Sequence, residues 1–123
     1  RAIDVARRNA AKIGVEKAIT WITSDIREII DHCHTVLQNP PFGVRSRGAD
    51  RVFVQKALEV GHVIYSLHKD GLRNRRFLSG FVKELGGDIT HMFTMKLRIP
   101  PTFQFHQDKK HVVDVDLYRI EGR

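Results

Sequence analysis

The strongest periodic pattern of the chain lies in residues 16–41, EKAITWITSDIREIIDHCHTVLQNPP. From Ile19 to Leu37 the apolar residues recur at steps of three and four, which places them on one face of a helix. Asn39-Pro40-Pro41 follows, and a proline cannot continue the hydrogen-bond ladder of a helix. The pattern therefore predicts a long amphipathic helix over residues 16–38.

The segments around this helix indicate a mixed order of helices and strands. Residues 44–56 and 59–68 are rich in β-branched and aromatic residues, which is typical of strands. Residues 72–93 return to a helical pattern, interrupted at Gly80, and residues 96–106 alternate as a strand does. The sequence thus predicts an α+β domain, a three-stranded sheet with helices packed on one face.

Composition narrows the class of function. The chain has 123 residues, 28% of them charged, and a net charge of +7. One cysteine cannot form a disulfide within the chain, and no apolar run approaches the ~20 residues of a membrane-spanning helix. A small domain this basic usually binds a polyanion, and nucleic acid is the first candidate. The alternative is a basic surface without a partner.

Arginine clusters in two places in the middle of the chain. Arg45, Arg47 and Arg51 form the first cluster, and Arg73, Arg75 and Arg76 form the second. The planar guanidinium offers paired donors that suit phosphate. We expect both clusters to contact RNA, although either could be a solvated segment without a partner.

Three stretches together resemble the ribosome-binding factor A family, whose members assist small-subunit assembly. They are residues 39–43, NPPFG, residues 52–65, VFVQKALEVGHVIY, and residues 95–108, MKLRIPPTFQFHQD. The resemblance covers residues 17–108 and implies a single KH-like type II domain. On this reading residues 1–16 are a basic helical arm, and residues 109–123 are a charged tail that could add a short strand.

The resemblance implies a non-catalytic biogenesis factor. It would bind immature small-subunit ribosomal RNA near its 3′ end and the decoding region, together with the subunit precursor and other assembly factors. Neither a cofactor, a membrane nor a small-molecule substrate is expected. A permanent structural protein of the small subunit, such as a mitochondrial one, is the alternative. The divergence of the chain suggests the mitochondrial matrix, with the bacterial cytoplasm or plastid stroma as alternatives.

The expected RNA-binding residues follow from the arginine clusters and from this resemblance. In the family a kink near Ser79 and Gly80 takes the place of a Gly-x-x-Gly loop, and glycine lets an RNA backbone approach closely. Lys83 shares a helix face with Arg76. Lys96 and Arg98 alternate outward on the last strand, where they could equally serve only to keep an edge soluble. The full set is Arg45, Arg47, Arg51, Arg73, Arg75, Arg76, Ser79, Gly80, Lys83, Lys96 and Arg98.

An enzymatic site is not expected from the sequence. His32 and His34 point to nearly opposite sides of the predicted helix, so they cannot chelate one metal ion together. The remaining histidines are scattered singly, and no glycine-rich phosphate loop is present in the sequence. We therefore predict neither a catalytic residue nor a metal site.

Overall fold

The computed structural model of the protein describes residues 1–41, 49–99 and 111–122. Four strands and three α-helices make up most of these residues. In chain order they are α1 (Ala2–Lys12), β1 (Cys33–Gln38), α2 (Ala49–Val60), β2 (Gly61–Lys69), α3 (Leu72–Glu84), β3 (Asp88–Ile99) and β4 (His111–Glu121). Two short 3-10 helices, η1 (Glu16–Ala18) and η2 (Ile26–Glu28), lie between α1 and β1.

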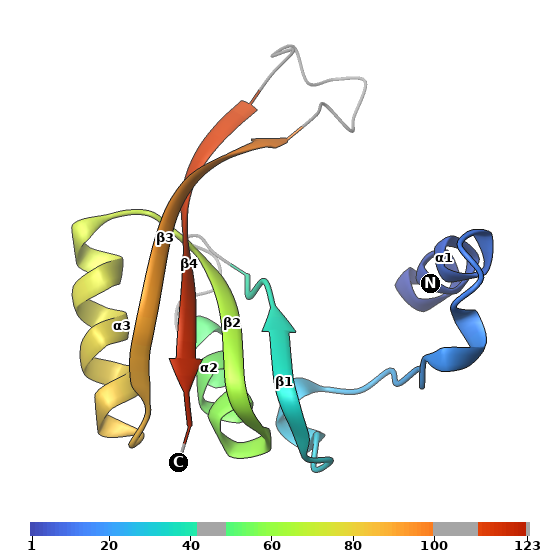
Figure 1. The fold of residues 1–123 in the computed structure, drawn as a ribbon, viewed down its shortest axis with the longest axis horizontal. Helices are drawn as coiled ribbons and strands as arrows, with labels where there is room; N and C mark the ends of the chain where they lie inside the picture. Colours follow the sequence, from blue (N-terminus) through green and yellow to red (C-terminus); the bar gives the residue numbers. More distant parts are fainter. Residues whose placement is uncertain (42–48, 100–110, 123) are drawn as a thin grey trace.

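The strands form one mixed sheet in the order β1-β2-β4-β3 (Figure 1). β1 and β2 are parallel neighbours joined through α2, the crossover that parallel strands require. β4 is antiparallel to both β2 and β3. Strands β1, β2 and β3 therefore run in the same direction, and their carboxyl ends meet at one edge of the sheet.

Helices α2 and α3 cover one face of this sheet, and the core lies between them and the strands. Val54 and Ala57 of α2 pack there with Leu78 of α3 and with Ile64 of the central strand β2. In α2 the buried residues are three apart, as the inner face of a helix requires. Each of these four side chains is at most 3% exposed.

The opposite face of the sheet carries apolar side chains that no helix in the described part of the chain covers. Tyr65, Leu67 and Leu117 point to this face, and Leu37 beside them is 77% exposed. Helix α1 lies apart from the sheet and contacts η1 (Figure 1). Parallel strands normally have both faces covered, so this face has the character of a packing surface.

The predicted KH-like type II fold is wrong, and the largest error falls on residues 16–38. That segment contains η1, η2 and strand β1 where we expected one long helix. Short apolar runs fit the repeat of a helix as well as that of a strand, and here the β-branched residues Thr35 and Val36 favour the strand. Several of the expected helix-face residues are exposed, Ile22 at 53% and Ile30 at 80%.

Two further elements differ from their predictions. Residues 49–60 form helix α2, whereas a strand was expected over 44–56, because burial of Val54 and Ala57 against the sheet outweighs local β propensity. Helix α3 ends before Gly86, and β3 already begins at Asp88, so the expected helix over 72–93 is too long. Gly86 adopts a positive φ of 84° and closes α3 with the hydrogen-bond pattern typical of a helix-ending glycine.

Other expectations agree with the structure. The strand expected over 59–68 corresponds to β2, and the helical arm corresponds to α1. The short strand expected in the tail is the long strand β4, which pairs on both sides. The expected domain boundaries after residues 16 and 108 stay predictions. None of the described helices is long and apolar enough to cross a membrane.

Candidate functional site

The sequence Asn39-Pro40-Pro41 directly follows β1 at the carboxyl edge of the sheet. Pro40 is fully buried, whereas Asn39 and Pro41 are exposed. Burial of the ring between them fixes the backbone while the amide of Asn39 stays accessible. In open α/β sheets, ligands bind outside the carboxyl ends of the parallel strands, so this edge is the first candidate for a site.

A buried chain of polar side chains lies behind Asn39, on the face that the helices cover. The amide of Gln38, the last residue of β1, donates to the hydroxyl of Ser66 at 2.9 Å. The Ser66 hydroxyl lies 2.6 Å from Nε2 of His68. Ser66 is 0% and His68 3% exposed, so both side chains are cut off from water.

The surroundings of His68 keep its imidazole neutral. Burial lowers the pKa of His68 to about 4, against the opposing attraction of the carboxylates of Asp50 and Asp116. The phenol ring of Tyr118 packs edge-on against the imidazole, with ring centroids 5.6 Å apart. Burial also raises the pKa of Tyr118 to about 12, and its hydroxyl has no hydrogen-bond partner among the described groups.

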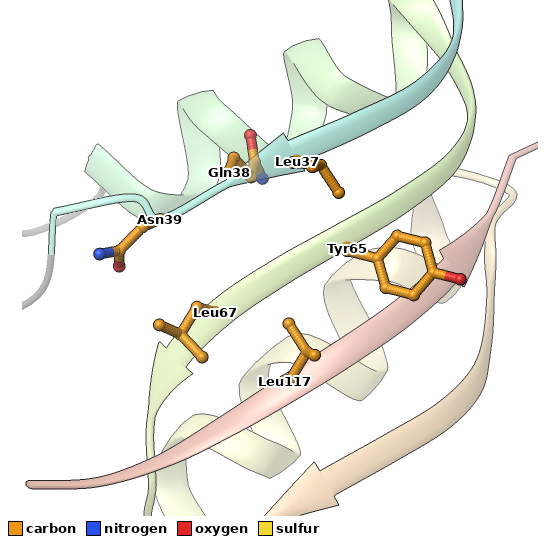
Figure 2. Close-up of a pocket in the computed structure, with 6 residues that line it drawn as sticks. All are labelled: Leu37, Gln38, Asn39, Tyr65, Leu67 and Leu117. Atoms are coloured by element: carbon orange, nitrogen blue, oxygen red, sulfur yellow. The ribbon is translucent and has the colours of Figure 1, made fainter. Parts of the chain in front are cut away.

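A groove with a volume of about 550 Å³ opens on the other side of the same strands (Figure 2). Its lining is almost entirely apolar and comes from β1, β2 and β4. The lining residues are Leu37, Gln38, Asn39, Tyr65, Leu67 and Leu117. The groove lies on the sheet face that the described helices leave open, so its apolar lining fits packing against protein better than binding of a charged ligand.

Several of the expected RNA-binding residues gather at the carboxyl edge. Arg73 and Arg76 are exposed in the first turns of α3, which follows the end of β2. Lys96 and Arg98 are exposed near the end of β3, where β3 and β4 pair beyond the end of β2 (Figure 1). Lys96 lies 3.5 Å from the carboxylate of Asp114, and its side chain is 75% exposed, so the contact leaves it open to solvent.

These basic residues lie on the same side of the sheet. Thr94, Lys96 and Arg98 share one side of β3, because side chains alternate along a strand. The hydroxyl of Thr94 is 3.3 Å from the guanidinium of Arg75, so this is the side that α3 covers. Arg51 at the start of α2 is exposed and stacks over the ring of Phe77, 4.8 Å from its centroid.

Arg75 does not belong to this exposed group. Its guanidinium donates to both carboxylate oxygens of the fully buried Asp116, at 2.8 and 3.0 Å, and to Asp70 at 2.7 Å. These hydrogen bonds hold the pKa of the Asp116 carboxyl below its usual range. We therefore read Arg75 as a structural residue that neutralises a buried charge, although the sequence placed it with the phosphate-binding arginines.

The remaining expected residues are spread more widely. Ser79 and Gly80 lie exposed in the middle of α3, which continues from Leu72 to Glu84, so Gly80 does not separate two helices. Lys83 is exposed in the last turn of this helix, about 10 Å along its axis from Arg76. Arg45 and Arg47 lie outside the described residues.

The sequence reasoning missed Gln38, Asn39, Ser66 and His68. Asn39-Pro40-Pro41 was interpreted as a helix stop, although an amide and two prolines after a strand also mark a fixed, polar strand end. Ser66 and His68 alternate within an apolar strand, and a buried pair of polar residues in such a pattern needs a partner. Within the described residues no cluster of three or more side chains could hold a metal ion.

Comparisons with known proteins give the site a context. No protein-family model matches the chain. It is 36% identical over 132 residues to the uncharacterized protein MJ0284 of Methanocaldococcus jannaschii. It is 28% identical over 127 residues to the rRNA N(6)-adenosine-methyltransferase Mettl5 of Drosophila melanogaster. Each alignment covers 98% of this chain and 58% of the relative.

A solved structure shows the same fold. The crystal structure of PH1948 from Pyrococcus horikoshii, named a "putative RNA methyltransferase", superposes with a TM-score of 0.85 at 36% identity. The superposition covers 98% of this chain and 58% of that chain. The chain therefore spans less than two thirds of the length of each of these three proteins.

These comparisons overturn the functional expectations drawn from the sequence. Two of these three proteins are named as methyltransferases, so the resemblance to ribosome-binding factor A misled the interpretation. A non-catalytic assembly factor, a structural subunit protein and the absence of an enzymatic role are contradicted with it. The exclusion of a small-molecule substrate is overturned as well, because the reaction for which Mettl5 is named requires a methyl donor.

Proposed function

We propose that this chain carries the base-binding side of an RNA methyltransferase that acts on N6 of an adenosine in ribosomal RNA. The similarity to Mettl5 over nearly the whole chain supports the reaction and the substrate. The observation that carries the proposal is the position of Asn39-Pro40-Pro41. This turn lies fixed and accessible at the carboxyl edge of the parallel strands.

The chemistry of this turn suits an exocyclic amino group. The side-chain carbonyl of Asn39 can accept a hydrogen bond from one N–H of adenine N6. Pro40 and Pro41 have carbonyl oxygens but no backbone N–H, so their peptide groups act as acceptors only. Acceptors at both N–H groups would orient the amine and leave its lone pair free to attack the methyl group of the donor.

The basic residues at the same edge would hold the RNA backbone. Arg73 and Arg76 on α3 and Lys96 and Arg98 on β3 point away from the core on the helix-covered side. Phosphate contacts of this kind supply affinity and make binding depend on salt, but they do not select a base. Selection would rest on Asn39 and its neighbours.

The methyl donor of such a reaction is S-adenosylmethionine, and the groove beside Asn39 does not fit it. The groove beside Asn39 is lined by four apolar side chains and two amides, with no carboxylate among its lining residues that could bind the ammonium or ribose groups. The donor supplies the methyl group when bound, and we assign no residue of the described segments to hold it. This agrees with the chain spanning 58% of the length of MJ0284 and Mettl5.

The proposal is tested by methylation of ribosomal RNA in vitro. The full-length protein, labelled S-adenosylmethionine and ribosomal RNA should give N6-methyladenosine in a nuclease digest. Asn39→Ala should lower the rate by about a hundredfold, the scale of losing an oriented hydrogen bond at a reacting group. Asn9→Ala, on the exposed surface of α1, is the matched control. Equal rates for the two variants, or a label on another base, would contradict the proposal.

A further inference from the structure

The turn at Asn39 is held from both sides, and only one of its two anchors is an ordinary packing contact. On the carboxyl side the ring of Pro40 is buried. On the amino side Gln38 is fixed by its hydrogen bond to Ser66, its direct register partner on β2. The orientation of the peptide that carries Asn39 therefore depends on a side-chain hydrogen bond inside the protein.

We propose that Ser66 and His68 are positioning residues that fix Gln38, and through it Asn39, and that they do so with a neutral imidazole. The inference rests on the proposed function, because it gives these residues a role in orienting the group that receives the adenine amine. Neither residue contacts the substrate side of the turn.

The donors and acceptors available on Gln38, Ser66 and His68 determine which group donates each of their two hydrogen bonds. Gln38 donates an N–H to the Ser66 oxygen at 2.9 Å, which leaves the hydroxyl proton of Ser66 free for His68. Nε2 of His68, 2.6 Å away, accepts that proton only when it carries none of its own. The arrangement that pairs the Gln38 N–H, the Ser66 hydroxyl and Nε2 is therefore the neutral imidazole with its proton on Nδ1.

Protonation of His68 would reverse this direction. Both ring nitrogens would then be donors, Ser66 would accept from two sides, and its own proton would lose its partner in a buried site. The groups around the ring have opposing effects on the protonation of the imidazole. Asp50 on α2 and Asp116 on β4 favour the cation, whereas burial opposes it and Arg75 already neutralises Asp116. Tyr118 on β4 contacts the ring by its edge.

The test separates positioning from a purely structural role. Ser66→Ala removes the hydroxyl that joins Gln38 to His68. It should lower kcat for methyl transfer at least tenfold, with KM for RNA within about twofold of wild type. His68→Gln places an amide oxygen near the position of Nε2 and should keep kcat within about threefold. His62→Gln, an exposed histidine near the start of the same strand, is the matched control.

A measurement without activity accompanies the kinetics, since Ser66→Ala could also lower stability. Nitrogen-15 NMR of the wild type should show His68 as the neutral Nδ1–H form from pH 7 to pH 5. Ser66→Ala should shift the side-chain amide signal of Gln38, and His62→Gln should not.

Any one of four results would overturn the inference. An active wild type with an equally active Ser66→Ala variant refutes the positioning role and leaves the proposed function intact. A charged His68 at pH 7, or an unmoved Gln38 amide signal, refutes the hydrogen-bonded arrangement of Gln38, Ser66 and His68 itself. A wild-type protein without methyl transfer refutes the proposed function, and the positioning role falls with it.

Discussion

Arg75 offers the sharpest test of the structural account, because the sequence and the structure give it different roles. The carboxylate of Asp116 is 0% exposed and takes two of its three hydrogen bonds from Arg75, at 2.8 and 3.0 Å. The third comes from the hydroxyl of Thr94 at 3.2 Å. Arg75→Ala would leave a buried charge with one neutral donor, and Arg76→Ala on the same helix would remove an exposed cation only.

Breaking a buried ion pair costs about 3–5 kcal/mol, chiefly because the remaining charge is left uncompensated. Water reaches this pair from the arginine side, so we expect the low end, about 3 kcal/mol for the stranded carboxylate of Asp116. With a typical urea dependence of about 2 kcal/mol per molar, the unfolding midpoint of Arg75→Ala should fall by about 1.5 M. Arg76→Ala should stay within about 0.5 kcal/mol of the wild type.

Acid provides a second check on the same variant. Arg75 holds the pKa of Asp116 below its usual range, so the wild type keeps this stabilisation above that range and loses it as the pH falls. In Arg75→Ala burial is no longer opposed by the guanidinium, so the carboxyl of Asp116 takes up a proton at a higher pH than in the wild type, which removes the buried charge and narrows the difference in stability. Equal urea midpoints for the two variants at pH 7 would refute the structural role of Arg75.

Three further predictions concern stability, each measured by urea unfolding. Gly80→Ala should stabilise the protein by about 0.5–1 kcal/mol, because Gly80 lies inside α3 and an added Cβ would meet no atom within 4 Å; a loss would contradict the continuous helix. Gly61→Ala should destabilise it, since its Cβ would lie 2.7 Å from a methyl group of Val36, and an unchanged midpoint would refute the close β1–β2 contact. The pKa of His68 is about 4 in the folded protein and 6.5 in the unfolded chain, so the unfolded chain binds more protons between these two pH values. Stability should therefore fall by up to about 3 kcal/mol as the pH drops from 6.5 to 4, a fall that His68→Gln should lack.

Local signals in the sequence were sufficient for some elements and ambiguous for others. The strand β2 was predicted correctly because its β-branched and aromatic residues alternate and Asp70-Gly71 ends it. The start of helix α3 was predicted correctly. Gly86 marks its end, but the expected helix was extended past this glycine to residue 93.

The larger errors came from contacts that are distant in sequence. The segment Val52–Val54 has strand propensity, yet it becomes helical because Val54 packs against strands formed elsewhere in the chain. β1 is only six residues long, and its place in the sheet depends on pairing with β2 through the crossover. A short parallel strand of this kind carries little periodicity of its own, so residues 16–38 were assigned to a helix.

The candidate site was predicted only in part, for the same reason. Exposed arginines and lysines can be proposed from charge alone, and Arg73, Arg76, Lys96 and Arg98 do lie exposed at one edge. The hydrogen bond between Gln38 and Ser66 joins residues 28 positions apart and becomes visible only once β1 and β2 are paired.

We propose that the protein methylates N6 of an adenosine in ribosomal RNA. The most direct measurement is mass spectrometry of ribosomal RNA from cells of its source organism, with and without the gene. We expect that one N6-methyladenosine disappears when the gene is deleted, returns with the wild-type gene, and stays absent with Asn39→Ala. An unchanged level of N6-methyladenosine in the deletion strain would contradict it.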